Sequence, residues 1–162
     1  MKTIRFILLL GMVFFCGSQF LNAQNGKSEK AQEVRDLIES GTFNIDVNRA
    51  IPLSGRSVVL TSTYGLEIKG DSIYANLPYY GRAYSAPYGG GGGLNFDKPL
   101  TDYKVKFDKK KKATIRFSTR SDDDRYEFTI QVFSNGKASV FVQPTNKQSI
   151  TYDGELQPKK KD

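Results

Sequence analysis

From Thr42 onward, apolar residues recur at every second position, and this alternation constrains the fold more than any other feature of the chain. Phe43, Ile45 and Val47 begin the pattern, which is typical of strands with one buried face. The alternation returns between residues 58 and 77 and again between residues 101 and 153. The sequence therefore predicts an antiparallel sheet with one apolar and one polar face.

Turn residues between the alternating segments predict how the strands pair. Gly70-Asp71 forms a two-residue turn with glycine first, which places Ile68 opposite Ile73. A two-residue turn at Asn135-Gly136 would set Val140 opposite Gln131, so that the two apolar sets would face opposite sides. A three-residue loop, residues 134–136 with a left-handed Gly136, instead pairs Ile130 with Val140, and we predict this loop.

Two further loops complete a five-stranded meander over residues 101–153. A four-residue loop over Ser121 to Asp124 pairs Phe117 with Phe128, and its aspartates are interpreted as a solvated turn. A loop through the lysine run pairs Tyr103 with Phe117. The predicted apolar row across the sheet is Tyr103, Phe117, Phe128, Val142 and Ile150.

A helix is expected before the sheet. Ser28 can cap a helix that ends near Ser40, and Gly41 follows as its left-handed residue. Residues 50–56 are expected to form a loop because they contain proline and glycine. We therefore predict an α+β, β-rich fold, in which an N-terminal helix packs on an antiparallel meander sheet that curls into an open barrel or a two-layer sandwich.

The first residues are typical of a cleavable secretory signal peptide. Lys2 and Arg5 precede an apolar run that ends at Phe15, and Ala23 supplies the small residue before a cut. A lipoprotein signal with a lipidated Cys16 is the alternative, which Phe15 disfavours because a small residue is expected there. The predicted organisation is signal peptide 1–23, linker 24–27, one β-rich domain 28–156 and basic tail 157–162. We expect a soluble periplasmic or outer-surface protein.

Cleavage would remove the only cysteine, and the chain has no histidine. Disulfides, histidine-dependent nucleophile pairs and the usual zinc, haem and iron–sulfur ligands are thereby excluded. No metal site or cofactor is predicted, and no catalytic residue is assigned. A hydrolase that uses two of Glu67, Asp102 and Glu127 remains an alternative, although nothing in the sequence brings two of them together.

Basic residues give the chain a formal net charge of +7, concentrated in Lys109–Lys112 and Lys159–Lys161. We interpret both runs as solvated, with weak contact to anionic surfaces as the alternative. Nucleic acid is not expected as a partner because the signal peptide directs the chain out of the cytoplasm.

Loop 77–93 concentrates tyrosine and glycine, the composition that binding loops favour. The predicted ligand-binding residues are Tyr79, Tyr80, Arg82, Tyr84 and Tyr88. Alternatively, these tyrosines pack over an open end of the sheet, with their hydroxyls bonded to backbone or water. The five glycines Gly89–Gly93 are interpreted as a flexible connector.

Three groups of residues together resemble one known family. They are Leu77-Pro78-Tyr79-Tyr80-Gly81-Arg82-Ala83-Tyr84 with Pro87-Tyr88-Gly89, the Gly70-Asp71 and Asn135-Gly136 turns, and Ile150-Thr151-Tyr152-Asp153-Gly154. With these motifs, the chain from about Gln32 to Leu156 is similar to domain-of-unknown-function family 4251, exported proteins of Gram-negative bacteria. The resemblance implies no activity for any residue.

The function is therefore left as three hypotheses. The first is a non-catalytic envelope module that binds an unknown envelope ligand or protein through loop 77–93. The second is a structural or partner-binding envelope protein, and the third is a carboxylate-based hydrolase.

The predicted cleavage can be tested by intact-mass measurement of the protein recovered from cells. The expected mass is that of a chain beginning at Gln24. A mass that includes Met1, or one with acyl chains on Cys16, would contradict it.

Overall fold

The computed structural model describes residues 19–84 and 93–158, which form one helix and nine strands. The elements are α2 (Gln19–Glu39), β1 (Thr42–Pro52), β2 (Val58–Lys69), β3 (Ser72–Pro78), β4 (Gly93–Pro99), β5 (Thr101–Phe107), β6 (Ala113–Arg120), β7 (Arg125–Val132), β8 (Lys137–Pro144) and β9 (Ile150–Gln157). All paired strands are antiparallel, in the order β4-β3-β2-β1-β9-β8-β7-β6-β5.

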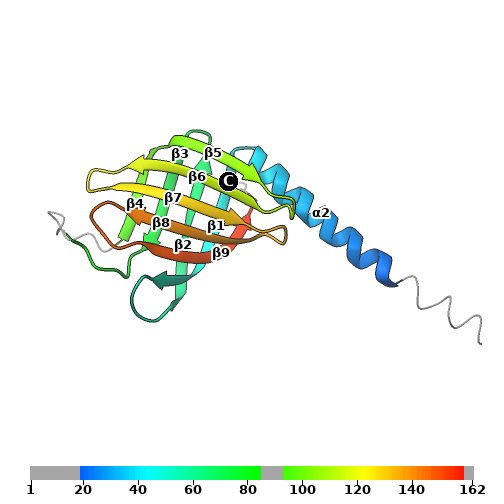
Figure 1. The fold of residues 1–162 in the computed structure, drawn as a ribbon, viewed down its shortest axis with the longest axis horizontal. Helices are drawn as coiled ribbons and strands as arrows, with labels where there is room; N and C mark the ends of the chain where they lie inside the picture. Colours follow the sequence, from blue (N-terminus) through cyan, green and yellow to red (C-terminus); the bar gives the residue numbers. More distant parts are fainter. Residues whose placement is uncertain (1–18, 85–92, 159–162) are drawn as a thin grey trace, which may run out of the picture.

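The sheet curls until β4, one of its two edges, meets β6 and β7 near the other edge. In Figure 1, β5 to β9 run across the face formed by β2, β3 and β4. The edge strands β4 and β5 are joined by Leu100 alone. The Thr119 hydroxyl donates a 2.9 Å hydrogen bond to the Pro99 carbonyl, and Lys98 forms a 3.0 Å ion pair with Asp122. The result is a nearly closed barrel with a helix packed on it, which confirms the predicted fold class.

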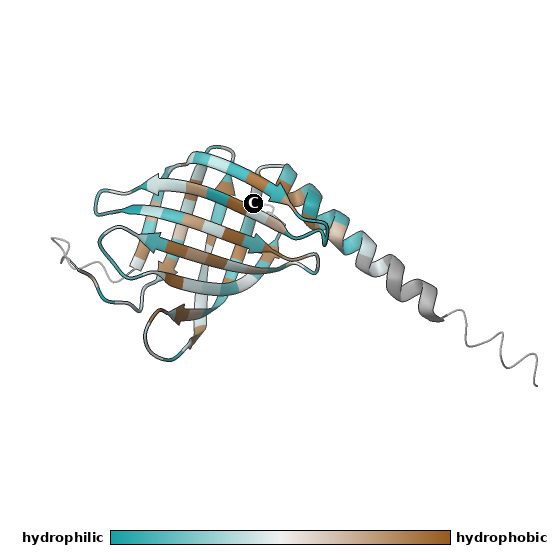
Figure 2. Cartoon of the chain, viewed as in Figure 1, coloured by the Kyte–Doolittle hydropathy of each residue, from teal (hydrophilic) through white to brown (hydrophobic). Residues whose placement is uncertain are grey.

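Side chains fill the inside of this barrel. Along β7 and β8, buried and more exposed residues alternate, and Figure 2 shows brown and teal bands on the strands. Phe96 of β4 stacks on Tyr126 of β7 at 5.0 Å between ring centroids, and Phe117 stacks on Phe128 at 4.9 Å. Because Phe96 lies on the strand at the sheet edge, these rings pack the two sides of the closure together.

The predicted local registers are confirmed. Ile68 lies opposite Ile73, and the Gly70 φ of +62° places this residue in the left-handed region that the turn requires. Ile130 lies opposite Val140, so the three-residue loop with its left-handed Gly136 forms instead of the two-residue turn. Phe117 likewise lies opposite Phe128.

The register predicted by pairing Tyr103 with Phe117 is confirmed from Lys104 to the end of β5, where Val105 lies opposite Ile115, but it is interrupted before Lys104. Thr101 pairs with Ser118 and Lys104 with Arg116, so β5 contains an irregularity at Asp102, whose φ is +57°. The Tyr103 ring still stacks on Phe117 at 6.2 Å, but 36% of the residue is exposed. Strict alternation does not anticipate an inserted residue, which here shifts the pairing of Thr101 at the start of the strand.

Several predicted boundaries also need correction. The helix begins at Gln19 rather than Ser28, so residues 24–27 are helical instead of a linker. Gly26 lowers helix propensity without ending the helix. Strand β1 continues to Pro52, which was expected to lie in a loop, and β9 extends to Gln157. Strand β4 was not predicted, because Leu94 and Phe96 make only two steps of alternation before Pro99.

The C-terminal half of α2 packs over one end of the barrel, while its N-terminal half projects away (Figure 1). Its buried face is Ala31, Val34 and Ile38, each at most 4% exposed. The Arg35 guanidinium lies 4.6 Å from the centroid of the Phe107 ring, a cation–π contact with the end of β5. Within the described residues, the helix is not long and apolar enough to cross a membrane.

Strand β1 contains an irregularity where it pairs with β9. Val47 pairs with Gly154, and the register shifts between Val47 and Arg49. A Cβ atom at residue 154 would collide with the Asp46 carbonyl oxygen, so the two backbones approach closely only because this residue is glycine. Such an irregularity bends the strand and increases its local twist.

We expect Gly154→Ala to lower the free energy of unfolding by roughly 2–4 kcal/mol, since the two strands must separate to admit the methyl group. The control is Gly26→Ala, because a Cβ atom there meets nothing within 4 Å. That variant should change stability by at most about 1 kcal/mol. Urea denaturation measures both, and equal stabilities for the two variants would refute the close-approach explanation.

Candidate binding site

The predicted tyrosine residues follow β3 at the end of the barrel opposite α2 (Figure 1). We call residues 79–84 the tyrosine segment. Tyr79 is half-buried, whereas Tyr80 is 41% and Tyr84 70% exposed, and Arg82 is exposed as well. Tyr88 lies outside the described residues. The structure therefore divides the predicted site into one inward and three outward residues.

Hydrogen bonds hold the tyrosine segment against the loop between β8 and β9. The backbone amide of Gln148 donates a hydrogen bond to the backbone carbonyl of Arg82 at 2.9 Å. The backbone amide of Tyr84 donates one to the backbone carbonyl of Asn146 at 2.8 Å. Between them, Ala83 and Lys147 form an isolated antiparallel bridge. The backbone that carries Arg82 and Tyr84 is thus fixed by residues more than sixty positions away in the sequence.

Tyr79 connects this segment to the β8–β9 loop. Its hydroxyl donates to the Gln148 carbonyl at 2.8 Å, and the Lys147 ammonium lies 5.6 Å from its ring centroid. Burial raises the pKa of Tyr79 above its ordinary value, as it does for Tyr152, whose hydroxyl donates to the Pro78 carbonyl at 2.9 Å. These two tyrosines match the alternative in which the rings close an end of the sheet.

Asp124 anchors the loop on which the tyrosine segment rests. Its residue is 5% exposed, and its carboxylate accepts hydrogen bonds from the backbone amides of Arg125 at 2.8 Å, Thr145 at 3.1 Å and Asn146 at 3.1 Å. The prediction of a solvated turn is therefore wrong for Asp124. Adjacent aspartates suggested exposure, and the partners that bury Asp124 are about twenty residues away. Such charge-assisted bonds are stronger than neutral ones.

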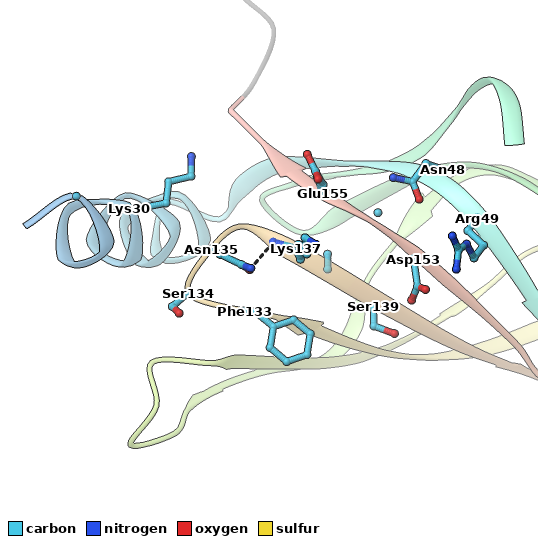
Figure 3. Close-up of a pocket in the computed structure, with 13 residues that line it drawn as sticks. Lys30, Asn48, Arg49, Phe133, Ser134, Asn135, Lys137, Ser139, Asp153 and Glu155 are labelled. Carbon is cyan, nitrogen blue, oxygen red and sulfur yellow. Dashed lines mark hydrogen bonds between the residues drawn. The ribbon is translucent and has the colours of Figure 1, made fainter. Parts of the chain in front are cut away.

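A second candidate is a groove of about 1090 Å³ on the outer face of β1, β8 and β9, flanked by α2 (Figure 3). The charged and aromatic residues that line it are Lys30, Arg49, Phe133, Lys137, Asp153 and Glu155. Ser139, Asp153 and Arg49 form one row across the three strands. The mixture of donors and acceptors suits a polar ligand, but none of the predicted site residues lines this groove.

Little in the sequence indicates this groove. Its position depends on the pairing of β1 with β9 and on the irregularity before Arg49, and both result from long-range packing. Phe133 was the one visible signal, an apolar residue on the polar face that is 42% exposed.

The candidate catalytic carboxylates are dispersed. Glu67 lies on β2 and Glu127 on β7, with β1, β9 and β8 between them in the sheet, while Asp102 lies at the irregularity of β5. No group of three or more Asp, Glu, Cys or His residues that could hold a metal occurs within residues 19–84 and 93–158.

Comparison with known proteins agrees with this fold. The family model described as "Domain of unknown function (DUF4251)" matches residues 25–156. The chain belongs to the DUF4251 family. A crystal structure of a DUF4251 family protein from Bacteroides eggerthii is similar, with a TM-score of 0.66 and 20% sequence identity, over 83% of this chain and 91% of that one. A search of curated proteins gives no match.

The lysine run of this DUF4251 domain forms the tip of the β5–β6 hairpin. Lys109, Lys110 and Lys111 are exposed, as predicted for a solvated loop. The Asp108 carboxylate accepts hydrogen bonds from the amides of Lys110 at 2.8 Å and Lys112 at 2.9 Å, which fixes the turn. The second run, Lys159–Lys161, lies outside the described residues.

We expect Asp124→Asn to destabilise the protein by roughly 2–4 kcal/mol, because a neutral amide replaces a buried carboxylate that accepts several N–H groups. The amides of Thr145 and Asn146 should then exchange hydrogen faster. The matched control is Asp122→Asn, whose side chain is 92% exposed and should cost at most about 1 kcal/mol. Unchanged exchange at Asn146 in Asp124→Asn would contradict the anchoring role.

Proposed function

We propose that this DUF4251 protein is a non-catalytic binding module of the bacterial envelope, and that the tyrosine segment contacts its ligand. The observation that carries the proposal is the exposure of Tyr80, Arg82 and Tyr84 on a backbone fixed by the β8–β9 loop. Their exposed rings and guanidinium are not used to build the core, whereas Tyr79 is.

A fixed backbone favours recognition because fewer degrees of freedom are lost when a ligand binds. Tyrosine offers a large contact area with only two side-chain torsions to immobilise. Arg82 can bind a carboxylate or phosphate in a bidentate manner. The ligand we propose therefore combines an anionic group with an apolar surface.

Placement in the envelope is supported by the signal-like residues 1–23. The alternative of a partner-binding protein that uses an open sheet edge has less support, because β4, one of the two sheet edges among the described strands, packs against β6 and β7. A hydrolase has least support, since β1, β9 and β8 separate Glu67 from Glu127.

The test is to screen envelope-derived glycans, peptides and lipids against the protein and against the double variant Arg82→Ala, Tyr84→Ala. We expect the double variant to lose at least about tenfold in affinity for any ligand found, as central aromatic and arginine contacts usually do. Binding by the unaltered protein should persist at raised salt, which screens long-range charge.

Two control variants make this test specific. Tyr74→Ala removes a tyrosine that is 55% exposed on β3, away from the segment, and should leave binding unchanged. Replacement of Lys109–Lys112 by glutamine removes the basic run. If the folded double variant keeps every interaction while the lysine variant loses them, the tyrosine segment is structural and the proposal is wrong.

A further inference from the structure

The hairpin between β1 and β2 carries large apolar side chains in water. We call residues 49–59 the apolar hairpin. Leu53 is 65% exposed, Val59 68% and Ile51 36%. In Figure 1 this hairpin extends away from the body of the barrel, and in Figure 2 its strands are brown on both sides of a teal tip. Its apolar residues thus lie on a protrusion and not in a cleft.

The geometry of this hairpin is well defined. Ala50 pairs with Val58 and Arg49 with Val59, so β1 and β2 are joined as far as Ala50, and the next two residues of β1 pair with β9 alone. Gly55, with a φ of +110°, supplies the unusual backbone conformation that the tip needs. The apolar surface continues onto the neighbouring strands, because Ile51 pairs with Thr151 and Thr151 with Phe141, which is 38% exposed.

The charged residues of the apolar hairpin itself have one sign, while Asp153 of β9 lies opposite Arg49. Between Asp46 and Glu67 the sequence contains Arg49 and Arg56 and no acidic residue. Both arginines are exposed. Single exposed apolar residues are common on protein surfaces, but a connected group of them beside cations indicates a contact surface.

We propose that the apolar hairpin inserts into an anionic phospholipid surface. Leu53 and Val59 enter the boundary between headgroups and acyl chains, where apolar side chains leave water without needing a pocket of fixed shape. Arg49 and Arg56 remain at headgroup level and attract lipid phosphates. A convex tip suits this deformable partner better than a rigid protein surface, which would need a matching cavity.

This surface is distinct from the tyrosine segment and from Lys109–Lys112. The lysine run attracts anions through long-range charge alone, whereas the apolar hairpin adds burial of apolar area, which salt does not screen. The inference is therefore independent of the proposed ligand site.

Vesicle flotation measures the interaction directly. The protein used is the form recovered from cells, with its N-terminus established by intact mass, because an uncleaved apolar leader would itself bind lipid. We expect binding to vesicles of phosphatidylethanolamine with phosphatidylglycerol, and weaker binding to phosphatidylcholine alone. The double variant Leu53→Ser, Val59→Thr should reduce partitioning at least about tenfold, since it removes several buried methyl groups. Its thermal unfolding should remain unchanged, because both residues are exposed.

Charge and position are tested by further variants. Arg49→Gln and Arg56→Gln should each weaken binding to anionic vesicles about fivefold and leave binding to phosphatidylcholine unchanged. Tyr74→Ser, which removes comparable exposed surface on β3, should have no effect.

The absence of tryptophan from the chain allows a direct test of insertion. Leu53→Trp introduces a single reporter at the tip, whose emission should shift to shorter wavelength with anionic vesicles and be quenched by brominated acyl chains. Tyr74→Trp should show neither change.

Three results would overturn the proposal. The first is no vesicle binding and no emission shift of the Leu53→Trp variant. The second is binding that survives Leu53→Ser, Val59→Thr and is lost when Lys109–Lys112 are replaced by glutamine. The third is self-association in sedimentation experiments that Leu53→Ser, Val59→Thr abolishes, which would show that a second copy of the chain covers this surface.

Discussion

The close approach of β1 and β9 at Gly154 is the contact on which the rest of the structure depends. The two backbones meet where a side chain would strike the Asp46 carbonyl, and the register shift beside Val47 turns the sheet at the same place. This bend lets one apolar face cover itself, so that Phe96 on the edge strand β4 reaches Tyr126 of β7. With the interior filled by side chains, any recognition has to occur on the ends, loops or outer face.

The two ends of the barrel are closed by different elements. This closure shows which residues hold the fold together and which remain available for contact with a ligand. At one end, the amphipathic face of α2 covers the opening with Val34 and Ile38. At the other end, the hydroxyl groups of Tyr79 and Tyr152 donate hydrogen bonds to backbone carbonyls. The buried Asp124 fixes the β8–β9 loop, to which Tyr79 is hydrogen-bonded. The exposed rings of Tyr80 and Tyr84 are therefore carried by a fixed backbone. The tyrosine segment therefore contains a residue that holds it in place, Tyr79, as well as exposed residues that are available for contact.

The parts of this structure that were predicted from sequence are those set by neighbours along the chain. The Ile68–Ile73 and Ile130–Val140 pairs follow from loop length and a two-residue period, which are local. The β1–β9 pairing joins segments far apart in the sequence, and residues 79–92 separate β3 from β4, so no short turn specifies either pairing. Asp124 was misassigned for the same reason, since its burial depends on residues 145 and 146. For the candidate site, the tyrosine-rich composition was enough to predict which segment to consider. Only the tertiary contacts of Tyr79 distinguish it, as a structural residue, from its exposed neighbours.

The central claim is that the barrel interior is packed, so that ligands can be recognised only outside it. The most direct test is the methyl NMR spectrum of the protein during titration with a long-chain fatty acid such as oleate. The inward methyl groups of Ile130, Val140 and Val142 are essentially unexposed, and their resonances should remain unchanged throughout the titration. Saturable shifts of these methyl resonances would show that the barrel opens to admit a ligand and would contradict the account.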